Sequence, residues 1–145
     1  MLNIVIATVP LVTLSRDRVL GDSKMAANPN FTKPWHGIPR EEIEWFPTVF
    51  ADRCMGCGIC VTSCGRQVYA FDYEQNVAVV EHPLQCMVGC TTCATLCTRD
   101  AIEFPSQGYI RQVIRKRKLE RQTKDVLKAN REQYDIRLHE GEPTK

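Results

Sequence analysis

A chain of 145 residues is long enough for one domain with a modest core, and a second full domain is not expected at this length. Hydrophobic residues make up 43% and charged residues 25%, so composition argues against both a disordered chain and an integral membrane protein. The formal net charge is only +2, but eight cysteines are unusual in so short a chain.

The chain opens with an apolar run, LNIVIATVPLVTL, which could be an export signal. The run covers about thirteen residues, contains Pro10, has no basic residue before it and is shorter than the roughly 20 residues that span a bilayer. We therefore expect no signal peptide and no membrane anchor, and a cytoplasmic protein whose thiols stay reduced. Alternatively, residues 1–24 are an upstream extension and Met25 is the working start.

Residues 1–45 are predicted to be an N-terminal extension that ends in an arm wrapped on the core. Between positions 28 and 47, four prolines alternate with four aromatic residues. Proline at this density prevents a long helix, while the aromatic side chains favour burial. One helical turn is expected at residues 40–44.

Residues 46–105 are predicted to form one domain from two similar halves. In each half an apolar stretch precedes a group of cysteines and another follows it, VYAF in the first half and AIEF in the second. Residues 67–73 and 77–81 have the β-branched and aromatic content of strands, and residues 74–76 are a suitable hairpin turn. The expected fold class is α+β, with two tandem βαβ halves in one small sandwich.

Residues 106–145 are predicted to form a basic C-terminal helix and tail. No Pro or Gly occurs over residues 109–139, most residues there are good helix formers, and Ser106 is a suitable N-cap. The simplest prediction is a single long helix over 109–139. Its few apolar side chains leave only a narrow stripe, so much of the helix must be solvated or held by a partner.

All cysteines lie in two groups, CMGCGICVTSC at residues 54–64 and CMVGCTTCATLC at residues 86–97. Three thiolates spaced about two residues apart on a tight loop can each face one corner of an iron–sulfur cube, and a fourth, one helical turn later, points elsewhere. Gly56, Gly58 and Gly89 are expected to adopt positive φ values that aim backbone N–H groups at sulfur. The candidate ligands are Cys54, Cys57, Cys60, Cys64, Cys86, Cys90, Cys93 and Cys97.

Over residues 46–105 the chain resembles the bacterial-type ferredoxins that carry two 4Fe-4S clusters. In that family the fourth cysteine of each group binds the cluster of the other group. Two features depart from the family: Gly65 and Thr98 stand where it usually has proline, and the second group has a wider first gap. The resemblance implies one cluster held by Cys54, Cys57, Cys60 and Cys97, and another held by Cys86, Cys90, Cys93 and Cys64.

The cysteines could instead form a zinc module, or be buried thiols without a cofactor. Zinc sites usually pair two CxxC knuckles across a longer spacer, and zinc folds rarely use the run CxxCxxC. Inert cysteines would not gather in two groups. No phosphate-binding glycine loop and no Ser–His–acid set accompanies the cysteines, so the sequence predicts an electron carrier, or a subunit of an oxidoreductase, without a substrate site of its own.

Charge is distributed unevenly along the chain. Residues 41–110 contain nine acidic and three basic residues, a net charge of −6, whereas residues 111–131 contain nine basic and two acidic residues, a net charge of +7. An acidic cluster domain suits docking to redox enzymes, and a free carrier needs neither the arm nor the basic helix. We therefore expect a dedicated donor or subunit of an oxidoreductase complex, which docks on redox partner proteins through the cluster domain and the basic helix 109–139.

Two alternatives to this role stay open. The first is a freely diffusing ferredoxin that has extensions at its two termini. The second is a nucleic-acid-binding iron–sulfur protein that uses the basic run IRKRKLERQTK, although such a run is usually a solvated helix face. Phosphate binding with a steep dependence on salt would distinguish the second alternative.

Overall fold

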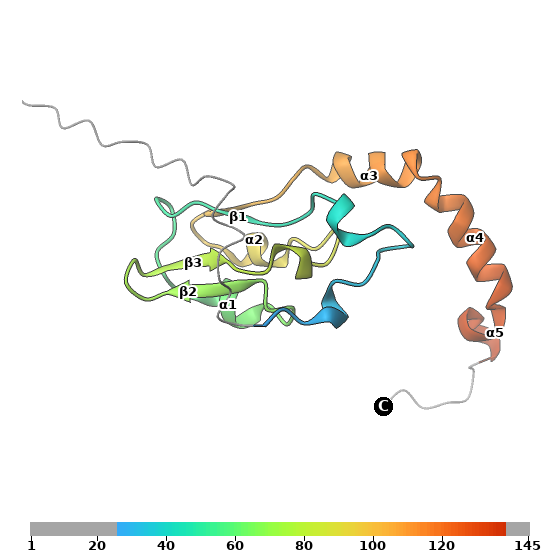
Figure 1. The fold of residues 1–145 in the computed structure, drawn as a ribbon, viewed down its shortest axis with the longest axis horizontal. Coiled ribbons are helices and arrows are strands. Elements are labelled where there is room, and N and C mark those ends of the chain that lie inside the picture. The colour runs from blue at the N-terminus through green and yellow to red at the C-terminus, as the bar shows by residue number, and fades with distance from the viewer. Residues whose placement is uncertain (1–25, 139–145) are drawn as a thin grey trace, which may run out of the picture.

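The two longest strands form a hairpin in the computed structural model, which describes residues 26–138 (Figure 1). Strand β2 (Tyr69–Asp72) pairs antiparallel with strand β3 (Val77–Val80). In the turn, a carboxylate oxygen of Asp72 accepts hydrogen bonds from the backbone N–H groups of Glu74 and Gln75, at 2.9 and 3.0 Å. This is the usual way in which an aspartate stabilises a turn. The predicted hairpin turn at residues 74–76 is therefore confirmed.

A second, shorter antiparallel pair joins the two ends of the cysteine-containing segment. Strand β1 (Thr48–Val49) pairs with strand β4 (Ile102–Glu103). Between the strands lie two short helices that contact each other, α1 (Ile59–Ser63) and α2 (Thr92–Leu96). The result is a small α+β fold with two short antiparallel sheets, in which neither pair joins strands from the same half of the segment.

The N-terminal arm contributes side chains to the core. Its two 3-10 turns are Pro29–Phe31 and Arg40–Glu42, so the turn expected near residue 40 is present. Trp45 is fully buried, stacks on Phe104 with ring centroids 5.6 Å apart, and donates a hydrogen bond from Nε1 to the Cys90 carbonyl oxygen at 3.2 Å. Burial of an indole is worth on the order of 4 kcal/mol. The arm is therefore part of the folded unit.

The single long helix predicted over 109–139 is wrong within the described residues. The chain forms three helices, α3 (Gln107–Lys116), α4 (Leu119–Ala129) and α5 (Arg131–Tyr134), followed by a 3-10 turn at Ile136–Leu138. Ser106 occupies the N-cap position of α3, as predicted, but its side chain makes no capping hydrogen bond. The part of the prediction beyond residue 138, and the predictions for residues 1–25, lie outside the described residues.

Burial of Leu119 explains the first break. Ile110 and Leu119 are 8% and 3% exposed, yet a continuous helix would place them on opposite faces, since nine residues correspond to a rotation of about 180°. Lys118 instead adopts the left-handed conformation, with φ 54° and ψ 35°, and redirects the chain. That conformation costs about 1–2 kcal/mol, whereas burying a leucine side chain contributes roughly 1.5–3 kcal/mol. Tertiary packing therefore overrides helix propensity here.

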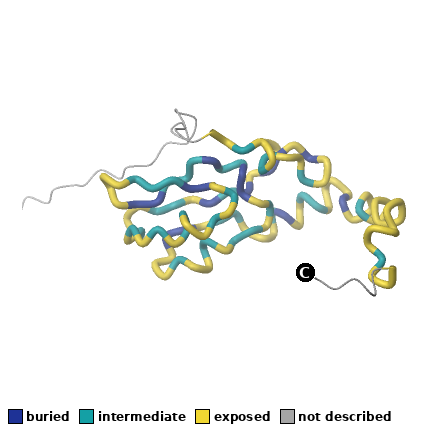
Figure 2. The backbone as a smooth tube through the Cα atoms, turned by 90° about the horizontal axis from the view of Figure 1, so that it is seen from below, coloured by how far each residue is buried: buried dark blue, intermediate teal, exposed yellow. Residues whose placement is uncertain are grey.

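The end of α3 is also tied to the N-terminal arm, because Arg117 forms an ion pair with Glu42. Beyond this point α4 and α5 extend away from the core (Figure 1). Figure 2 shows that most of their length is exposed. None of the helices in the described range is both long and apolar enough to cross a bilayer.

Candidate metal centre

The first cysteine group lies on a loop that turns sharply and then enters α1. The Cys54 N–H donates to the Phe50 carbonyl oxygen at 3.0 Å, which fixes the start of the loop next to β1. Gly56 and Gly58 have φ values of 72° and 71°, as the sequence predicts. Cys60 lies in the first turn of α1, and Cys64 is its C-cap residue. The helix therefore separates the fourth cysteine from the first three.

The second group has the same relation to α2. Cys86 is the C-cap residue of a 3-10 turn at Pro83–Gln85 and is buried. Gly89 has a φ of 87°, which confirms the third predicted glycine turn. Cys93 lies within α2 and Cys97 is the C-cap residue of that helix.

A cavity brings together cysteines from both groups. It is lined by Cys54, Cys57 and Cys60 from the first group and by Cys93 and Cys97 from the second. Apolar side chains complete its wall, including those of Val49, Ile59 and Ile102. The pKa of the Cys60 thiol is raised to about 11, mainly by burial and also by the charges of Cys54, Cys57 and Cys93. The three cysteines of the first group are therefore close enough to interact electrostatically.

The cysteines that do not line this cavity are Cys64, Cys86 and Cys90. The pKa of the Cys86 thiol is raised to about 12, mainly by burial and also by the charges of Cys90, Cys93 and Cys64, while the charge of Arg40 opposes the shift. These thiols are therefore close enough to interact, and Cys64 comes from the other group. Cys93 lies near both sets, since it also lines the cavity of the first group.

The donor set fits a polynuclear iron–sulfur group. All eight cysteines are free thiols, and thiolate sulfur is the ligand of such clusters. Among the described residues, no three His, Cys, Asp or Glu side chains are grouped closely enough to hold a single metal ion. Cluster iron binds the thiolate form of cysteine, so binding would displace the thiol protons.

Two further side chains contact the second cysteine group and were not recognised from the sequence. The Tyr69 hydroxyl donates a hydrogen bond to Cys93 Sγ at 2.9 Å. Arg40 donates from Nη2 to the Cys86 carbonyl oxygen at 3.0 Å. Both residues are buried, at 3% and 2% exposure. The sequence pattern around Tyr69 predicts only a strand and the core, and an arginine in a proline-rich arm carries no sequence signal of burial.

Comparison with known proteins decides the family. The chain is 37% identical over 78 residues to an uncharacterized ferredoxin of Methanocaldococcus jannaschii, an alignment that covers 53% of this chain and 52% of that protein. It is 30% identical over 76 residues to Ferredoxin-3 of a Nostoc species, covering 39% of this chain and 77% of that protein. The chain belongs to the ferredoxin family. This ferredoxin thus spans about half the length of the Methanocaldococcus relative.

The ferredoxin is also similar to part of a larger protein. Over 59 residues it is 40% identical to the indolepyruvate oxidoreductase subunit IorA of Pyrococcus abyssi, an alignment that covers 41% of this chain and 9% of that subunit. No protein-family model matches the chain, and no solved structure matches it significantly. Family membership assigns the two cysteine groups to iron–sulfur chemistry and electron transfer.

Proposed function

We propose that this ferredoxin carries two 4Fe-4S clusters in a domain of two βαβ halves, residues 46–105, and transfers electrons within an oxidoreductase system of the cytoplasm. The main support for this proposal is the cavity, because the first three cysteines of one group and the fourth cysteine of the other group line it together. When bound, such clusters accept and donate single electrons. The apolar side chains of Val49, Ile59 and Ile102 would exclude water from the ligating sulfurs.

The proposed ligand sets cross between the two halves. Cys97, at the end of α2, lines the cavity formed by the first group, and Cys64, at the end of α1, interacts with Cys86. Both relations agree with the crossed pattern of the family. One cluster would be held by Cys54, Cys57, Cys60 and Cys97, and the other by Cys86, Cys90, Cys93 and Cys64.

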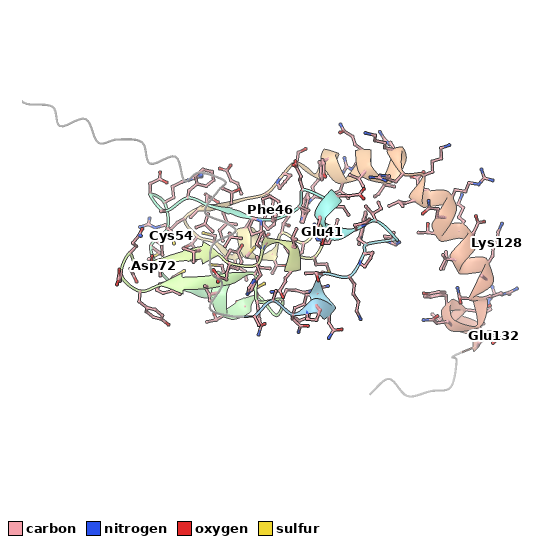
Figure 3. All side chains as sticks on the ribbon, viewed as in Figure 1. Glu41, Phe46, Cys54, Asp72, Lys128 and Glu132 are labelled. Atoms are coloured by element: carbon pink, nitrogen blue, oxygen red, sulfur yellow. The ribbon has the colours of Figure 1, made fainter. Side chains whose placement is uncertain are left out.

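We further propose that the helical arm formed by α3–α5 docks on a dedicated redox partner. Val126, Leu127 and Tyr134 are each about half exposed on α4 and α5, next to a surplus of basic residues. Exposed apolar side chains among basic residues suit a partner that has an apolar groove with acidic edges. Figure 3 supports separate roles for the two ends of the molecule, since Cys54 lies toward one end and Lys128 and Glu132 toward the other.

The similarity to IorA supports a dedicated role over free diffusion, because that relative is named as an oxidoreductase subunit. No feature of the described residues adds support for nucleic-acid binding beyond the basic run itself.

We also propose that the chain is divided into an N-terminal extension and arm (1–45), a cluster domain (46–105) and a basic C-terminal segment (106–145).

Iron and sulfide analysis of anaerobically purified protein tests the proposal. We expect about eight irons per chain, the content of two 4Fe-4S clusters, and after reduction an electron paramagnetic resonance (EPR) spectrum of two interacting clusters. Preparation in zinc-containing and iron-containing media provides the control for adventitious metal. One iron per chain, or stoichiometric zinc, would contradict the two-cluster assignment.

A further inference from the structure

Arg40 is a buried cation whose hydrogen bonds all go to backbone carbonyl groups. Its guanidinium donates to the Cys86 oxygen from Nη2 at 3.0 Å and from Nε at 3.3 Å, to the Ile43 oxygen at 2.6 Å, and to the Trp45 oxygen. Only 2% of the residue is exposed. None of the ion pairs within residues 26–138 involves Arg40.

Burying a guanidinium that forms no hydrogen bond with a carboxylate costs free energy, although the charge of Glu41 also attracts Arg40. Removing one ion from water costs several kcal/mol even after the protein relaxes, and arginine does not escape this cost by losing its proton. Carbonyl dipoles offset part of the cost. Burial lowers the pKa of Arg40, and the attraction of Cys86 is the largest influence that opposes this effect. The neighbouring cysteine group, once deprotonated and ligated, would supply further counter-charge.

Tyr69 adds a hydrogen-bond donor to the same cysteine group. It lies five residues after Cys64, and its hydroxyl donates to Cys93 Sγ at 2.9 Å. The position five residues after Cys97 is Ile102, which has no donor in its side chain. Cys97 Sγ instead accepts a hydrogen bond from the backbone N–H of Ala101, at 3.4 Å. The two halves therefore differ in the groups that face their sulfurs.

We infer that Arg40 and Tyr69 raise the reduction potential of the cluster held by Cys86, Cys90, Cys93 and Cys64 above that of the other cluster. Positive charge and hydrogen bonds to ligating sulfur favour the more negative, reduced state. The inference rests on the proposed function, because it requires two clusters. It makes the N-terminal arm part of the redox site, since Arg40 comes from the turn Arg40–Glu42.

The transfer involves a single electron and no proton. One electron enters from the redox partner protein, which is oxidised by one electron, and no bond forms or breaks. Arg40 keeps its proton, and the ligating sulfurs stay deprotonated. The first electron would thus reduce the cluster beside Arg40 and Tyr69, and the other cluster would be reduced only at a lower potential.

Redox titration of the full-length, anaerobically purified protein, followed by EPR spectroscopy, tests the inference. Arg40→Gln removes the buried charge, and Tyr69→Phe removes only the hydroxyl. We expect both variants to lower the higher of the two potentials by more than they lower the other one. For Arg40→Gln, the equilibrium constant for one-electron reduction should fall at least tenfold, which corresponds to about 59 mV.

Arg53→Gln is the matched control for loss of one positive charge. Arg53 precedes Cys54, but its side chain is 36% exposed and is paired with Glu103 at 2.9 Å. Water and salt screen such a charge, so Arg53→Gln should shift either potential by less than Arg40→Gln shifts the higher one. Iron content and circular dichroism are measured first for every variant.

The outcomes separate this inference from the proposed function. Fewer than eight irons in the parent protein contradicts the two-cluster proposal, and the inference falls with it. Eight irons with an unchanged higher potential in Tyr69→Phe, or equal falls of both potentials, overturns the inference alone. If Arg40→Gln does not fold, Tyr69→Phe decides the question. Arg40→Lys retains the positive charge, so it should lower the higher potential less than a neutral replacement of Arg40 that folds.

Discussion

Gly56 packs so closely against Asn76 that a Cβ atom placed on the glycine would lie under 3.0 Å from both the backbone oxygen and the side-chain nitrogen of Asn76. Gly56 belongs to the loop of the first cysteine group, and Asn76 to the turn of the β2–β3 hairpin. Both residues have positive φ values, 72° and 54°. The hairpin turn therefore supports the loop that carries Cys54 and Cys57.

Gly56→Ala should displace this loop and weaken iron binding there. The left-handed conformation costs an alanine about 1–2 kcal/mol, and the overlap with Asn76 adds roughly 1–3 kcal/mol. Iron content and the denaturant midpoint, both measured anaerobically, give the readout. Gly58→Ala should carry only the conformational cost, and Gly65→Ala neither cost, because no atom lies within 4 Å of a Cβ atom at either position and only Gly58 has a positive φ. Equal midpoints for all three variants would refute the proposed role of the contact.

Cys64→Ala should remove the cluster assigned to residues 86–93 and leave the other one in place. The reason is that Cys64 interacts with Cys86 and does not line the cavity of its own group. Cys97→Ala is the reciprocal variant and should remove the cluster of Cys54, Cys57 and Cys60. Each variant should retain about four irons, with EPR spectra that differ from each other. If Cys64→Ala instead damaged the cluster of Cys54, the crossed assignment would be wrong.

Leu119→Ala should destabilise the junction between α3 and α4. Leu119 is 3% exposed, and truncating a buried leucine to alanine typically costs about 2–5 kcal/mol. Leu127→Ala on the same helix is the matched control, because Leu127 is 51% exposed and its loss should cost less than about 0.5 kcal/mol. Denaturant titration monitored by circular dichroism measures the difference. A similar cost for both leucines would show that burial of Leu119 does not determine the break.

Charge reversal on α4 should weaken partner docking without changing the clusters. Arg121, Lys124 and Lys128 are exposed, whereas Arg117 is paired with Glu42 and is left intact. Changing the three exposed residues to Glu should slow electron delivery to the oxidoreductase partner, with an effect that shrinks as salt increases. Reduction potentials and iron content should stay as in the parent protein.

Reversing the charge of Lys33, an exposed residue of the N-terminal arm, controls for a general change in charge.

Truncation after residue 108 is a poor test of docking, because it would also remove contacts of the core. Ile110 and Leu119 pack in the core, and the Tyr109 hydroxyl accepts a hydrogen bond from the Glu44 N–H at 2.9 Å. Equal delivery rates for the parent and the triple variant across salt concentrations would rule out docking through α4.

Several features of this ferredoxin could be predicted from its sequence, because they depend on residues that are close together in the chain. The cysteine spacing indicates the ligand type because neighbouring residues on one loop stay close in any fold. The glycine turns at 56, 58 and 89 and the hairpin at residues 74–76 depend on local backbone preferences, and the structure contains all of them. The uneven charge likewise required only the order of the residues.

Long-range packing decided what the sequence could not reveal. A helix over 109–139 satisfies every local preference, but Leu119 can be buried only if Lys118 leaves the helical conformation. Arg40 is 46 residues from Cys86 along the chain, and its burial results from the path of the arm across the core. Tyr69 reaches Cys93 across 24 residues for a similar reason. Such contacts depend on which surfaces meet after folding, because the free energy of burial is shared among distant residues and leaves no local pattern.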